Sequence, residues 1–153
     1  MNSKSFRVNS AKTDWASLAM GAGIGLTIAL QVTTMRSADF RDTYQWLDTL
    51  ARTCALLGTY FSLAGVLLVA RIPWVERGVG HDRLVTWHRK LAPYSLFLIG
   101  FHVLLVLIGY AGEENRSLGS ELWILLTQYP WMTWALLAFY LMIQAGVTSY
   151  KKA

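Results

Sequence analysis

The sequence predicts an all-α integral membrane protein, a bundle of four transmembrane helices with both termini on the cytoplasmic side. Of its 153 residues, 54% are hydrophobic, and these are gathered into long runs instead of following the period of a soluble helix or strand. Four runs of about 18 or more residues contain no Asp, Glu, Lys or Arg, which is typical of membrane spans. Helices satisfy their own backbone hydrogen bonds in lipid, and open sheets do not.

The first uncharged run, Trp15 to Met35, predicts a helix over residues 15–35 that stays in the membrane. It is longer than the apolar core of a signal peptide, and no Ala-x-Ala type cleavage site follows it directly. Residues 1–14 are then expected to form a cytoplasmic N-terminal segment. The membrane domain is expected over residues 15–150, followed by a cytoplasmic tail at 151–153.

The second and third helices are expected over residues 50–70 and 84–111. They follow the uncharged runs from Thr53 to Ala70 and from Leu91 to Gly112. The third helix is extended towards residue 84 so that His88 lies at its cytoplasmic edge.

The fourth helix is expected over residues 131–150. The last uncharged run, Leu122 to Tyr150, is interrupted by Pro130, and proline disrupts a helix interior. The part before the proline, Leu122 to Tyr129, is expected to be a short apolar segment at the outer membrane surface.

The predicted orientation follows from the basic residues of the connecting segments. They are abundant before the first helix, between the second and third, and after the fourth. The basic residues of these three segments are Lys4, Arg7, Lys12, Arg71, Arg77, Arg83, Arg89, Lys90, Lys151 and Lys152. By the positive-inside tendency these segments are cytoplasmic, so the net charge of +5 is explained without a nucleic-acid partner.

Two histidines of the third helix are candidate cofactor ligands. His88 and His102 are 14 positions apart (102 − 88 = 14). At about 100° and about 1.5 Å per residue, both project from nearly one helix face and lie about 21 Å apart along the axis. An imidazole in lipid needs a partner, and a neutral imidazole is a good axial ligand for haem iron. The spacing favours two stacked haems; a helix–helix hydrogen bond is the alternative for each histidine.

The surroundings of the pair are expected to accommodate haem. The small side chains expected to leave room for a flat ring are Ala92, Ser95 and Gly109. Haem propionates need cations, and the candidates are Arg89 and Lys90 for the inner haem and Arg52 for the outer one. The alternative for these cations is a role in topology or in reaching the membrane surface. His81 is expected to be solvated in the loop.

The stretch from Arg71 to Leu91 contains Arg-Ile-Pro and Trp-His-Arg-Lys and runs on to Phe101-His102-Val. It resembles the ferric reductase-like transmembrane domain of ferric-chelate reductases, NADPH oxidases and related flavocytochromes b. The family pattern on the third helix is His, thirteen residues, His, which His88 and His102 match. The resemblance covers the chain as the first four helices of a six-helix domain. It implies a haem-b module of the cell membrane, with His88 on the inner haem and His102 on the outer haem.

The resemblance also implies electron flow from cytoplasmic NAD(P)H and FAD outward through both haems. The family takes the opposite axial ligands from a second His pair on its fifth helix, and neither that pair nor a motif for FAD or NAD(P)H appears up to Ala153. Three explanations are open: a truncated or split version of a longer protein, a separate chain supplying the missing helices or reductase domain, or a homodimer through the third helix. Truncation is favoured because Tyr150-Lys-Lys-Ala contains no structural stop. The alternative function is a cofactor-free four-helix scaffold or subunit of a membrane complex.

Overall fold

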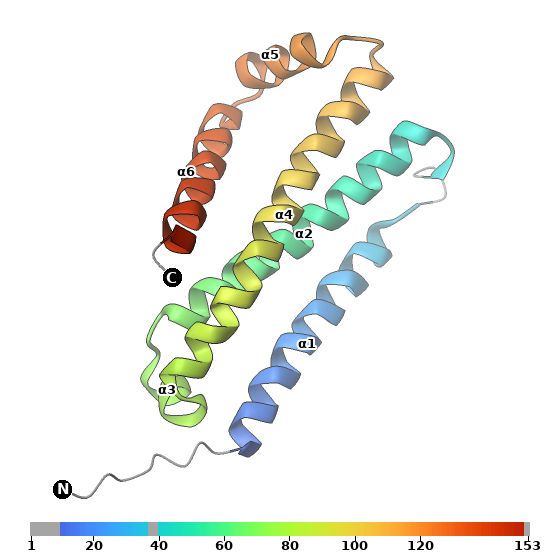
Figure 1. Ribbon diagram of the computed structural model, residues 1–153. Coiled ribbons are helices and arrows are strands. Elements are labelled where there is room, and N and C mark those ends of the chain that lie inside the picture. Colours follow the sequence, from blue (N-terminus) through green and yellow to red (C-terminus); the bar gives the residue numbers. More distant parts are fainter. Residues whose placement is uncertain (1–9, 37–39, 152–153) are drawn as a thin grey trace, which may run out of the picture.

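A computed structural model describes residues 10–36 and 40–151, which form six helices (Figure 1). They are α1 (Ser10–Thr34), α2 (Thr43–Val69), α3 (Pro73–Val79), α4 (His81–Glu113), α5 (Leu118–Gln128) and α6 (Met132–Lys151). Four of these, α1, α2, α4 and α6, are long and apolar enough to cross a membrane. The expected all-α architecture with four candidate spans is confirmed. Residues 1–9 of the expected N-terminal segment and 152–153 of the expected tail lie outside the described residues.

The outer faces of the spans are apolar. Leu18, Phe97 and Leu141 are 61%, 68% and 57% exposed and represent many large hydrophobic side chains on these faces. Lipid tails solvate such surfaces as well as a protein interior does. With 33 residues, α4 is about 50 Å long, so its ends extend beyond a hydrocarbon core about 30 Å thick. The chain is a multi-pass membrane protein.

The helix α2 begins at Thr43, and not at the expected residue 50. Asp42 caps it, because its carboxylate accepts a hydrogen bond of 2.6 Å from the backbone N–H of Thr43. Asp48 and Arg52 form an ion pair of 2.5 Å one helical turn apart. Asp48, which the expected start at residue 50 left outside the helix, therefore lies within α2.

The expected loop between the second and third spans contains α3. Pro73 stands in its first turn, where the missing N–H costs no hydrogen bond. Gly80 has a φ of 92°, which turns the chain directly from α3 into α4. As a result α4 begins at His81, before the expected residue 84, and the expected solvated loop position of His81 is a helix start.

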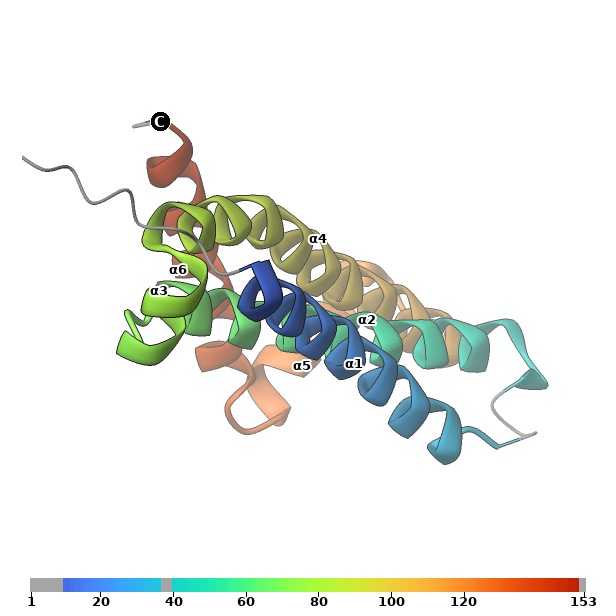
Figure 2. The same ribbon diagram turned by 90° about the horizontal axis from the view of Figure 1, so that it is seen from below.

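The central contact is the antiparallel pair α2 and α4 (Figures 1 and 2). Its core is formed by Ala51, Cys54 and Leu105. α1 packs along α2, where the Tyr60 hydroxyl donates a hydrogen bond of 2.7 Å to the carbonyl of Met20.

The C-terminal part folds back on α4. The helix α5 begins at Leu118, four residues before the apolar segment expected from Leu122 (122 − 118 = 4). Ser117 caps α5 by accepting from the N–H of Ser120 at 3.3 Å. Pro130 separates α5 from α6, as expected, and α6 runs back alongside α4 (Figure 1).

Candidate functional site

The face of α2 that contacts α4 carries small side chains. The buried small residues on this face are Ala51, Cys54, Gly58 and Gly65. A Cβ atom at Gly58 would lie only 3.2 Å from the backbone nitrogen of Ile99, and one at Gly65 would lie 3.5 Å from His88 Nδ1. Small residues let two helix backbones approach closely. Side chains of α4 therefore reach the backbone carbonyls of α2.

Three hydrogen bonds from α4 side chains to α2 carbonyls form a ladder, here called the α2–α4 ladder. They join His88 Nδ1 to Gly65 O at 2.9 Å, Ser95 Oγ to Gly58 O at 3.3 Å, and His102 Nδ1 to Ala51 O at 2.9 Å. The donors on α4 (88, 95, 102) and the acceptors on α2 (65, 58, 51) each recur every seven residues, in opposite directions along the sequence. Successive hydrogen bonds are therefore about 10.5 Å apart. The ladder holds the two histidines in one fixed register.

The ladder decides which ring nitrogen of each histidine carries hydrogen. A carbonyl oxygen can only accept, so Nδ1 of His88 and of His102 must be the donor. In a neutral ring Nε2 then has a free lone pair. Metal-binding histidines commonly donate their other ring N–H to a backbone carbonyl in this way, which fixes the ring orientation. Both residues therefore fit a haem-iron ligand set through Nε2.

The middle rung contains a second hydroxyl. Ser62 Oγ lies 2.5 Å from Ser95 Oγ, and Ser95 is 4% exposed. The expectation that Ser95 leaves room for a haem ring is wrong, because its side chain is packed and hydrogen-bonded against α2. Gly109 is also buried on α4, where a Cβ would lie at an ordinary contact distance of 3.8 Å from Leu47 Cβ, but it borders a cavity at the outer end of α2 and α4.

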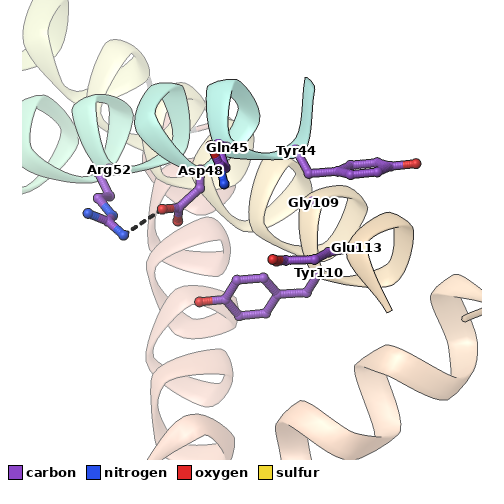
Figure 3. Close-up of a pocket in the computed structure, with 7 residues that line it drawn as sticks. All are labelled: Tyr44, Gln45, Asp48, Arg52, Gly109, Tyr110 and Glu113. Carbon is purple, nitrogen blue, oxygen red and sulfur yellow. Dashed lines mark ion pairs between the residues drawn. The ribbon is translucent and has the colours of Figure 1, made fainter. Parts of the chain in front are cut away.

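Arg52 follows Ala51, the acceptor of the His102 rung, and lines a cavity of about 310 Å³ (Figure 3). Asp48, Tyr110 and Glu113 also line this cavity. The side chain of Arg52 is 64% exposed and paired with Asp48. With two carboxylates against one guanidinium, the cavity attracts cations more than anions. A propionate at Arg52 would have to share or exchange the guanidinium with Asp48.

The basic residues beside His88 point in different directions. Lys90 lies about 200° round the helix from His88, and Arg89 about 100°. Lys90 lines a groove between α4 and α1, which does not include Arg89. His81 lies at the start of α4, where its Nδ1 is 3.4 Å from Glu76 Oε1. The structure therefore does not bring His81 to the ladder.

The carbonyl partners of the histidines are the part of the site that the sequence did not predict. Every residue has a backbone carbonyl, so the acceptors cannot be recognised by residue type. The small side chains of the accepting residues can be recognised. Ala51, Gly58 and Gly65 recur every seven positions along α2, as the donors do along α4. This matching period in two neighbouring spans is the sequence signal for the ladder.

Comparison with known proteins identifies one family. The family described as ferric reductase like transmembrane component matches residues 54–153. The match contains most of α2 and all of α3 to α6, including both histidines and two of the three carbonyl acceptors. No curated protein and no solved structure matches the chain.

Proposed function

The chain belongs to the family of ferric reductase-like transmembrane components, and on that premise we propose that it is a haem-b-binding module that carries electrons across the membrane. The observation that carries the proposal is the orientation of the two histidines. Both donate Nδ1–H to a carbonyl of α2, and both keep Nε2 for a ligand. The same ring nitrogen of each histidine is therefore left available to iron, as in metal-binding histidines whose other N–H bonds to a carbonyl.

The proposed role of His88 and His102 is to hold two haems at separate depths. Bound haem iron accepts and releases one electron at a time. The chain contributes the register: the rungs fix the two imidazoles about 21 Å apart along α4. It also excludes water, because the spans around the ladder are apolar. We propose His88 for the haem near the cytoplasmic side and His102 for the outer haem, with electrons moving outward.

Two arginines are proposed to contact the haem propionates. Arg89 is on the nearer side of α4 to His88, so it is the proposed partner at the inner site. Arg52 takes this role at the outer site by exchanging its ion pair with Asp48. Lys90 points nearly away from His88, so it is not part of this proposed propionate contact.

The opposite axial ligands are proposed to come from another polypeptide segment. The sequence contains three histidines, and the third, His81, is held at Glu76 away from the ladder. Further helices of the same domain type, on this or a separate chain, are one source; a second copy of this chain is another. FAD and NAD(P)H are proposed to bind a separate reductase domain.

A dithionite-reduced minus oxidised absorbance spectrum of membranes that contain the chain, compared with membranes that lack it, tests this function. We expect a b-type spectrum in membranes that contain the chain and its partner segment, because the two Nε2 atoms are positioned as ligands. Absence of the spectrum from such membranes would contradict the proposal. It would favour the cofactor-free scaffold, in which the histidine rungs only join α2 to α4.

The orientation is tested by thiol labelling from outside the cell. We propose that α3 is cytoplasmic and α5 external, because the α3 region is rich in basic residues. In intact cells, a membrane-impermeant maleimide should label Gly119→Cys on α5. It should label Arg77→Cys on α3 only after permeabilisation. The native Cys54 is buried and gives the unlabelled background. The reverse pattern would place His102 on the cytoplasmic side and invert the direction of electron flow.

A further inference from the structure

A groove of about 420 Å³ lies between α1 and α4, on the face of α4 next to the one that carries the ladder. α1 contributes Met20, Gly21 and Ile24, and α4 contributes Trp87, Lys90 and Leu91. The two helices run in the same direction (Figure 1). The lining residues of both helices therefore follow the same order from the membrane surface inward. The groove is open along its length, as a site for a lipid tail at the surface of the bundle would be.

The groove is amphipathic. Its walls are mainly apolar, and of residues 10–36 and 40–151 Lys90 is the one basic residue that lines it. Among these same residues no carboxylate lines the groove, and none lies within 4.0 Å of the Lys90 ammonium as an ion-pair partner. Asp14 on α1 and Asp82 on α4 both precede the lining residues in their helices. The mouth of the groove therefore combines a cation with an apolar slot.

Lys90 lies at a position along α4 that is expected to be at the membrane surface. Trp87, one turn before it, is a residue type enriched at the boundary between headgroups and hydrocarbon. Arg83 is nearer still to the start of α4, and its guanidinium donates to Thr13 Oγ1 at 3.1 Å. This bond joins the ends of α4 and α1 above the groove. Uncharged residues follow Lys90 from Leu91 onward.

We propose that this groove binds one anionic phospholipid, with its phosphate at Lys90 and an acyl chain against Met20, Ile24 and Leu91. The charge selects an anionic headgroup, because basic pockets between membrane helices are known to bind such lipids. The apolar wall of the groove packs against the acyl chain of the lipid. The groove faces α1 and the ladder faces α2, so the proposal does not rest on haem binding.

Two glycines of α1 provide a matched pair of variants. A Cβ at Gly21, which lines the groove, or at Gly25, which does not, would meet no atom within 4 Å. Gly21→Leu should therefore fill the groove without disturbing the helix packing. Gly25→Leu adds the same side chain one turn further along and is the control. Lys90→Gln removes the charge and keeps a long polar side chain.

The test is native mass spectrometry of the full chain in detergent, titrated with phosphatidylglycerol or phosphatidylcholine. We expect one phosphatidylglycerol per chain to bind in preference to phosphatidylcholine. Lys90→Gln should weaken phosphatidylglycerol binding about five-fold, and Gly21→Leu should abolish it. Gly25→Leu should bind like the unaltered chain.

Several results would overturn the proposal. Equal binding of both lipids, or a preference that survives Lys90→Gln, would show ordinary boundary lipid. A neutral quinone retained in place of phosphatidylglycerol would assign the groove to that ligand. A change from dimer to monomer in Gly21→Leu without added lipid would assign it to a second copy of the chain.

Discussion

His88→Ala and His102→Ala are each expected to remove one of the two proposed haems, and the double variant to remove both. Each substitution deletes the Nε2 lone pair that the α2–α4 ladder orients, and no other histidine lies at either rung. Haem per chain, measured by reduced-minus-oxidised absorbance in membranes containing the partner segment, should fall by about half in each single variant. Because the two sites are at different depths, the two single variants should lose different spectral components.

Two further substitutions separate loss of the ligand from loss of the fold. His88→Asn keeps an amide N–H near the position of Nδ1, so it can still donate to Gly65 O. It should lose haem as His88→Ala does, while retaining more stability. His81→Ala alters a histidine that pairs with Glu76 outside the ladder and should leave the haem content unchanged. Full haem content in His88→Asn would contradict axial ligation by His88.

The four spans were predictable because the membrane excludes charge. A helix crossing lipid must keep Asp, Glu, Lys and Arg out of a stretch of about 20 residues, and this leaves a clear mark in the sequence. The ends of the helices leave a weaker mark. Asp48 lies within α2, where it pairs with Arg52 along the helix surface, although its charge assigned it to the preceding loop.

The candidate ligands were predictable for a similar reason, since His102 stands in an otherwise uncharged run. The direction in which they point was not. Fourteen-residue spacing places His88 and His102 on one face but does not say which helix that face meets. That depends on the register of α2, which small residues set and which only the packed pair reveals. For this reason Ser95 was expected to leave room for a haem ring, whereas its hydroxyl forms the middle hydrogen bond of the ladder.

Gly58 is the position where the ladder is most sensitive to side-chain volume. A Cβ there would lie 2.8 Å from Ile99 Cγ1, 3.2 Å from the Ile99 backbone nitrogen and 3.3 Å from Leu98 Cβ. A side-chain atom can rotate away, but a backbone nitrogen moves only with its helix. We expect Gly58→Val to lower the free energy of unfolding by about 2 kcal/mol, because overpacking typically costs about 1–3 kcal/mol.

The matched control is Gly25→Val on α1. It places the same β-branched residue in a membrane helix where a Cβ meets no atom within 4 Å, so it isolates the effect of crowding. Unfolding in mixed detergent, followed by circular dichroism, compares the two variants. Equal stability of the two variants would show that the α2–α4 pair accommodates the added side chain without cost. If the crowding instead forces α2 and α4 apart, His88 and His102 lose their carbonyl partners on either side of Gly58, so the haem content of Gly58→Val should fall together with its stability. A destabilised variant with full haem content would show that haem binding does not need the ladder.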